Sequence, residues 1–365
     1  MKKVVPLLLI VAGVGSGWWF FNSQNTSLTG SSNDSRSTQS SPNQAASDSG
    51  SSANPESVAQ LDANSDARSA LINSANTMAE GIEEIKPAAE TYTSAEEAFA
   101  AALKGAKDFD DSILEQFTEP GPDCTWCPAF YNSVQEIVTN PNTPQDQKSY
   151  MAEILAISGR ADNVQVLVDS IKNAKSSTEA DIYAEALELT LGKDEVTKVL
   201  GEQLSTTNDT LREAAVAAVT NQGTLLAAQI LQKHIVERND PDAYYAQGTG
   251  PAELIPDEEA MPFVQEQVAK RDAYSPQWAK ALVNAGLPGL QSLFDQLENS
   301  TNPEADKALL QGLIDHVNYE DGVKELTDNI IANNRSQRAV EFARQIQDEI
   351  GQLEAEESEG TTESP

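Results

Sequence analysis

The sequence is poor in the side chains that most often carry out chemistry. It contains two histidines and two cysteines among 365 residues. A structural zinc ion usually takes four such ligands, so the scarcity argues against a zinc centre. Gly-x-Ser-x-Gly, P-loop and His-Glu-x-x-His motifs, which indicate known enzyme classes, are also absent from the sequence. We therefore expect no enzyme activity, no metal, no cofactor and no small-molecule substrate.

Positive charge is the second scarcity. Lysine and arginine together number 24, against 57 aspartates and glutamates, which gives a net charge of −33. Binding to nucleic acid requires a cationic surface, so we exclude nucleic acid as a partner. A solvated acidic surface aids solubility, and this explanation needs no partner. The alternative is an acidic face that binds a cationic protein or peptide.

Only one long apolar run occurs, and it lies at the start of the chain. Val4 to Phe21 contains 18 residues without a charge and follows Lys2 and Lys3. As a helix this run would be about 27 Å long, close to the thickness of the hydrocarbon core. The positive-inside rule keeps the two lysines in the cytoplasm and places the bulk of the chain in a bacterial periplasm. Four rings at the far end are typical of an interfacial anchor: Trp18, Trp19, Phe20 and Phe21.

Two interpretations of residues 1–21 remain open. The segment has the basic start and apolar middle of a signal peptide, and Gly15-Ser16-Gly17 offers small residues for cleavage. An Ala-x-Ala site is absent, and the four rings favour a retained single-pass anchor in the inner membrane. If cleavage occurs instead, the protein is secreted. Both interpretations export the bulk of the chain.

The segments at the two ends of the body have the composition of disordered chain. Residues 22–55 hold 12 serines and no aromatic residue, so we expect a flexible linker. Residues 352–365 hold five glutamates and no basic residue, which predicts an acidic disordered tail.

The body between these segments is predicted to be entirely helical. Apolar residues recur three and four positions apart, and glycine or proline separates the runs. Residues 56–93 are expected to form an N-terminal helical cap. Ser94 and Glu97 have the spacing of a capping box, which begins the helical repeat domain predicted for residues 94–351.

A repeated unit is visible within this domain. Residues 150–156, 183–189 and 212–218 are similar alanine-containing helical runs that lead to Gly159, Gly192 and Gly223. These glycines are 33 and 31 positions apart. A second apolar helix follows each glycine, so each unit is a two-helix hairpin that buries its apolar face only against its neighbours. The same pattern returns at residues 278–283 before Gly286 and at residues 308–314 before Gly322.

Proline positions indicate where some of the helices begin. Thr143-Pro144, Ser275-Pro276 and Asn302-Pro303 each place a capping residue before a proline that would occupy the first helical position.

This pattern resembles HEAT-like helical repeats. The period, about 31–34 residues, is also close to that of tetratricopeptide repeats, but their Trp, Leu-Gly and Tyr pattern is absent from the units. The resemblance implies an all-α fold, an α-solenoid of stacked two-helix repeats. It also implies a curved scaffold that binds another protein.

One unit breaks the pattern. Residues 239–261 contain three prolines and two glycines where a first helix is due, so a continuous helix is excluded. Tyr244 and Tyr245 would supply rigid contact area to a partner, or they would pack on the next helix. Trp126 and Trp278 are further candidates for partner contact. Acidic residues flank the segment, but the spacing of a calcium loop is missing.

Cys124 and Cys127 are expected to form a disulfide, because the chain is predicted to be exported. The alternative is a periplasmic thiol–disulfide oxidoreductase that uses the same pair. Such enzymes place the cysteine pair after a β-strand, and the sequence predicts no strand here. In addition, the first cysteine of such a pair should begin the helix, whereas Cys124 would lie before it. His234 and His316 fall on predicted helices without a catalytic partner.

The sequence therefore predicts a membrane-tethered, envelope-facing scaffold. Its partners would be another protein or peptide and, through the N-terminal helix, the inner membrane.

Overall fold

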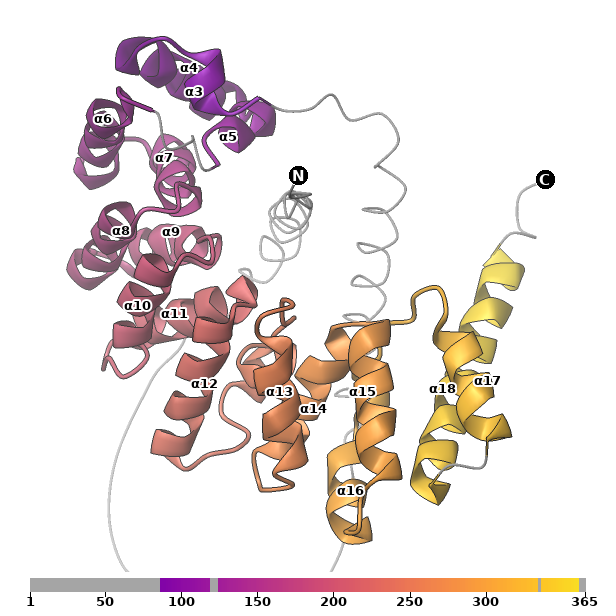
Figure 1. Cartoon of the computed structure of the whole chain (residues 1–365). Coiled ribbons are helices and arrows are strands. Elements are labelled where there is room, and N and C mark those ends of the chain that lie inside the picture. Colours follow the sequence, from indigo (N-terminus) through magenta and orange to yellow (C-terminus); the bar gives the residue numbers. More distant parts are fainter. Residues whose placement is uncertain (1–85, 119–123, 334–335, 361–365) are drawn as a thin grey trace, which may run out of the picture. The chain divides into compact units, whose positions relative to one another are not determined.

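The structure is a computed structural model and describes residues 86–118, 124–333 and 336–360. These residues belong to one compact unit, which begins at Ile85. Within the described residues there are sixteen α-helices, three short 3-10 helices and no strand (Figure 1). The prediction of an all-α fold is therefore confirmed.

The membrane-anchor residues Trp18, Trp19, Phe20 and Phe21 and the linker lie outside the described residues. Among the helices that are described, none combines the length and the apolar character needed to cross a membrane.

The α-helices carry the labels of Figure 1. The first ten are α3 (Ala88–Thr91), α4 (Ala95–Asp108), α5 (Asp111–Gln116), α6 (Cys127–Thr139), α7 (Gln145–Ile157), α8 (Ala161–Asn173), α9 (Ser177–Glu188), α10 (Asp194–Gln203), α11 (Asp209–Gln222) and α12 (Leu225–Arg238). The next six are α13 (Met261–Ala269), α14 (Ser275–Asn284), α15 (Leu287–Glu298), α16 (Pro303–Leu310), α17 (Val323–Ala332) and α18 (Gln337–Gly360). The 3-10 helices are η1 (Tyr245–Gln247), η2 (Pro251–Glu253) and η3 (Ile314–His316).

Successive helices pair as the repeat predicts. The hairpins α7–α8, α9–α10 and α11–α12 turn near Gly159, Gly192 and Gly223, and α14–α15 turns at Gly286. First helices pack on the next first helix: α4 on α7, α7 on α9, and α9 on α11. Second helices do the same from α6 through α8, α10, α12, α13 and α15 to α17. We call these the first-helix row and the second-helix row. Packing between neighbours of this kind fits a repeat solenoid.

Small side chains let the first helices approach closely. In α11, Ala214, Ala215 and Ala218 are almost entirely buried between α9 and the second helix of the hairpin. The core along the rows is filled mainly by leucine, isoleucine and valine, such as Leu155 and Leu187, which are fully buried. Burial of each such side chain contributes roughly 1.5–3 kcal/mol, which a single hairpin could not obtain alone.

The periodic glycines have a steric cause. Gly223 ends α11 with φ +66°, a conformation that glycine adopts most readily. Gly192 has an ordinary φ, but a Cβ atom at this position would lie 2.8 Å from Cγ2 of Thr224, in the next hairpin. The periodic glycine is therefore required by a tight turn at Gly223 and by close contact between neighbouring repeats at Gly192.

Side chains cap many of the helix starts. The Ser94 hydroxyl accepts a hydrogen bond from the Glu97 amide at 3.2 Å, as the capping box predicts, whereas the Glu97 carboxylate accepts from the Thr93 amide rather than from Ser94. Asn302 caps α16 as predicted. The other two proline-based predictions are off by one position, because α7 begins after Pro144 and α14 begins at Ser275.

Two predicted features near the ends of helices differ in the structure. The compact unit begins at Ile85, and Ala88 of α3, which falls in the predicted N-terminal cap, is fully buried in the core. The predicted tail, residues 352–365, is helical as far as Gly360, because alanine and glutamate there continue α18. The predicted helix over residues 308–314 is interrupted, since α16 ends at Leu310 and Gly312 has φ +64°.

Candidate functional site

Carboxylates gather along the first-helix row and on the neighbouring helix α5. Asp111 on α5, Glu153 on α7, and Glu185 and Glu188 on α9 act on one another electrostatically, although they come from three helices. We call these four residues the acidic strip. It arises because α5 packs on α7 and α7 packs on α9, which brings one side of each helix to the same surface.

Burial and mutual repulsion hold protons on this strip. Burial, and then the charges of Asp111 and Glu185, raise the pKa of Glu153 to about 7. Burial and the charge of Glu185 raise the pKa of Glu188 to about 7 as well. The pKa of Glu185 is also raised, by burial first and then by Asp181. Burial is the larger cause of each shift, and none of the described cationic side chains contributes to any of the three.

No ion pair in the described part of the chain neutralises the acidic strip. The ion pairs of the hairpins lie elsewhere: Lys148 binds Glu179 at 3.0 Å, Arg160 binds Asp162 and Arg212 binds Asp209. Among the described residues, a single side-chain hydrogen bond reaches a carboxylate of the strip: the Ser149 hydroxyl donates to Glu153 at 3.4 Å. The strip is therefore suited to a cationic ligand.

The sequence analysis did not single out these glutamates. A signal was present, because Glu153, Glu185 and Glu188 all lie in the alanine-containing first helices, shortly before a periodic glycine. Charged residues at that place in consecutive repeats share one face once the first helices stack.

The irregular segment, residues 239–260, takes the place of a first helix between α11 and α14. It contains only the short helices η1 and η2, which confirms that no continuous helix forms here. The Thr220 hydroxyl of α11 accepts a hydrogen bond from the Gly250 amide at 2.8 Å. The Asn284 amide of α14 donates to the Ala252 carbonyl at 2.9 Å. The segment is thus held on both sides and fills the gap in the first-helix row.

Tyr244 is part of the core and packs on a helix, the second of its two predicted interpretations, although the helix is α12 rather than the following one. It is 8 % exposed, and its hydroxyl lies 3.0 Å from Nε2 of His234 on α12. Its ring stacks on the His234 ring and lies under the Arg238 guanidinium. The residue adopts φ +69°, which turns its side chain toward α12 and the next residue toward α14.

Trp278 is also a core residue, in contrast to its predicted role. It is fully buried in α14, packs edge-on against Phe263, and donates its indole hydrogen to Gln232. Trp126 is half-buried and packs edge-on against Phe130 beside the disulfide. Of the four predicted contact residues, Tyr245 offers the most surface, since it is 40 % exposed.

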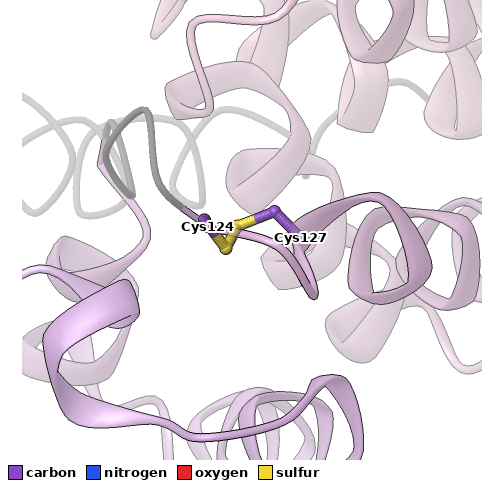
Figure 2. Close-up of a disulfide and its surroundings, with 2 residues drawn as sticks. All are labelled: Cys124 and Cys127. Carbon is purple, nitrogen blue, oxygen red and sulfur yellow. A yellow bond between two sulfur atoms is a disulfide. The ribbon is translucent and has the colours of Figure 1, made fainter.

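The two sulfurs of Cys124 and Cys127 lie at disulfide bonding distance, as the sequence predicts (Figure 2). Cys127 is the first residue of α6 and is 4 % exposed, and Trp126 rather than Cys127 occupies the N-cap. Cys124 precedes the helix and is half-buried. The bridge therefore fastens the start of α6 to the segment before it.

No group of three or more histidine, cysteine or acidic side chains suited to a metal ion occurs within the described ranges. No protein-family model matches the chain, and neither a curated protein nor a solved structure matches it. The candidate site therefore depends on the geometry of the acidic strip and of the irregular segment.

His234 makes the irregular segment sensitive to acid. Burial, and then the charge of Arg238, lower the pKa of His234 below its usual 6.5. The unfolded chain then binds a proton near pH 6.5 while the folded chain resists it, so stability is lost as the pH falls below that value. We expect the free energy of unfolding of the wild type, minus that of His234→Gln, to fall between pH 7.5 and pH 5.5. Urea unfolding at the two pH values measures this difference. A difference that stays constant with pH would contradict a neutral, buried His234.

Proposed function

We propose that the protein is a membrane-tethered, envelope-facing scaffold that binds a cationic segment of another protein. The N-terminal apolar run would hold the chain in a bacterial inner membrane, and the serine-rich linker would give the helical unit reach. A HEAT-like use of the stacked helices, with the first-helix row as the binding surface, is part of the proposal. No catalytic role or cofactor is included.

The observation that carries the proposal is the unneutralised acidic strip. Carboxylates from the three helices α5, α7 and α9 repel one another, and the free protein bears this cost. Lysine or arginine side chains of a partner would relieve the repulsion and form charge-assisted hydrogen bonds. Such an association should be fast at low ionic strength and weaken as salt is added.

Cross-linking in cells tests this proposal. A photoreactive residue at position 185, on the strip, should capture a partner with a basic surface. The same residue at position 202 should not, because Glu202 is exposed on α10 in the second-helix row. Glu153→Lys/Glu188→Lys should abolish the capture at position 185. Equal capture at both positions, or capture that resists both charge reversals, would remove the strip from the proposed function.

The proposed location has a separate test. In fractionated cells the full chain should sediment with the inner membrane, and protease added to spheroplasts should digest the helical unit. Recovery in the medium would instead support cleavage of the first segment, and a protease-resistant cytosolic protein would exclude export.

The alternative function is thiol–disulfide exchange by Cys124 and Cys127. We expect instead a structural bridge, with a reduction potential below about −300 mV, since structural disulfides of exported proteins resist the cellular thiol pool. Equilibration with glutathione or dithiothreitol buffers, read by thiol alkylation, measures the potential. A clearly more oxidising value would favour exchange over a structural role.

A further inference from the structure

One side of α14 carries a stripe of polar residues. Gln277, Lys280 and Asn284 are spaced three and four positions apart, so they lie along the same side of the helix. The irregular segment covers this side: Asp242 accepts from Gln277 Nε2 at 2.7 Å, Tyr245 lies over Lys280, and Ala252 accepts from Asn284. The rest of α14, including Trp278, is buried in the core.

One polar atom of this stripe is buried without a hydrogen-bond partner, and its one cation has no anionic partner among the described residues. Lys280 is 6 % exposed, and no carboxylate of the described residues forms an ion pair with its ammonium. What lies over the Lys280 ammonium is the ring of Tyr245, whose centroid is 3.5 Å from Nζ. Gln277 is 5 % exposed, and its Oε1 is buried without a partner.

Most of the Lys280 side chain is buried, although none of the described carboxylates lies beside its ammonium. Lysine is rarely buried to this extent without an anionic partner, because removing an ammonium from water is costly. A cation over a tyrosine ring regains part of this cost, whereas an anionic acceptor would regain more. The chain carries 57 acidic residues, and still none of the described ones pairs with Lys280.

We propose that Lys280 and Gln277 bind the C-terminal carboxylate of a peptide. Lys280 would donate to the carboxylate, and Gln277 Oε1 would accept from an amide N–H near the end of the peptide. A peptide C-terminus carries an anionic acceptor and an N–H donor close together, and this pair complements the two groups on one turn of α14. The acidic strip has no part in this site, so the inference goes beyond the proposed function and does not depend on it.

In the proposed site the Tyr245 ring would have to move aside for a ligand to reach Lys280. The ring covers the ammonium, lies beside the His316 ring and is 40 % exposed. The short helix η1 that carries it lies between two residues with positive φ, Tyr244 and Gly248. A Cβ atom at Gly248 would meet no atom within 4 Å, so the end of η1 has open space beside it. A bound carboxylate would take the place of the ring over Lys280.

A fluorinated dipeptide tests the inference on the full-length protein. The probe is N-acetylalanyl-4-fluorophenylalanine, as the free acid and as the C-terminal amide, observed by the broadening of its ¹⁹F signal. We expect saturable binding of the acid in the millimolar range and at least tenfold weaker binding of the amide. Lys280→Met should weaken binding of the acid at least tenfold, Gln277→Leu about threefold, and Tyr245→Leu should not weaken it.

Two further variants keep the test decisive. Lys233→Met removes an exposed lysine of α12 and should leave binding of the acid unchanged. Lys280→Arg keeps the charge and should retain binding, which covers the case in which Lys280→Met fails to fold. The inference is overturned if the acid and the amide bind the wild type equally or if neither binds. It is also overturned if folded Lys280→Met binds the acid as the wild type does.

Discussion

Replacing Gly223 by alanine should lower the free energy of unfolding by about 3 kcal/mol. Gly223 has φ +66°, where an alanine costs roughly 1–2 kcal/mol. The added Cβ would also collide with the carbonyl oxygen of Ile255, a backbone atom that cannot rotate away. The Asp257 amide donates to the Gly223 carbonyl at 3.0 Å, so any shift also strains this link between α11 and the irregular segment.

Gly248→Ala is the matched control for this substitution. Gly248 has nearly the same φ, +68°, but a Cβ atom there meets no atom within 4 Å. This control therefore has the backbone cost alone, about 1 kcal/mol. Urea unfolding followed by circular dichroism measures both variants. If the two substitutions cost the same, the close packing of the irregular segment on Gly223 is not a determinant of stability.

Removing charge from the acidic strip should stabilise the protein at alkaline pH. The pKa values of Glu153 and Glu188 rise from 4.5 to about 7 on folding. The folded chain then binds more protons than the unfolded chain between these values, so its stability falls as the pH rises from about 4.5 to 7. Shifts of this size correspond to roughly 3 kcal/mol per residue, which we reduce to about 2 kcal/mol for solvent screening.

We therefore expect Glu153→Gln/Glu188→Gln to be more stable than the wild type by about 2–4 kcal/mol at pH 8. Near pH 4.5 the gain should vanish, because the wild-type carboxyls are then protonated in the folded state. Glu136→Gln/Glu202→Gln removes the same number of charges from exposed positions on α6 and α10 and should change stability little at either pH. A gain that is independent of pH, or equal in the control, would contradict the burial and repulsion that raise the two pKa values.

The sequence predicts the hairpins well because their determinants are local. The run that ends at Gly223 has an N-cap at Asn208, buried alanines and a glycine at the turn, and each acts within a few residues. The same holds for the capping of α4 by Ser94. The disulfide joins cysteines only three positions apart, so its formation also needs no knowledge of the tertiary structure.

The irregular segment shows where such prediction ends. Tyr244 turns into the core because of its positive φ and its contact with His234 on α12, while Tyr245 lies over Lys280 on α14. A sequence pattern cannot predict which helix each tyrosine contacts. A signal for Lys280 does exist, as it is the one charge within the otherwise apolar run over residues 278–283.

The predicted tail failed for a different reason. Composition alone indicated disorder for residues 352–365, but a helix already begun at residue 337 extends at low cost through alanine and glutamate. Charge content therefore describes the solubility of this segment better than its conformation.

The gap in the first-helix row has a consequence for cooperativity. In a repeat array each repeat contacts only its neighbours, so the free energy of unfolding is the sum of the contributions of the repeats and of the interfaces between them. The weakest interface therefore decides whether the array unfolds in a single cooperative transition. Between α11 and α14 that junction consists of the irregular segment, with η2 packed on α14, and of the contacts that α12 makes with α13 and Trp278. Hydrogen exchange should then resolve two foldons, one ending at α12 and one beginning at α13, with Gly223→Ala uncoupling them further.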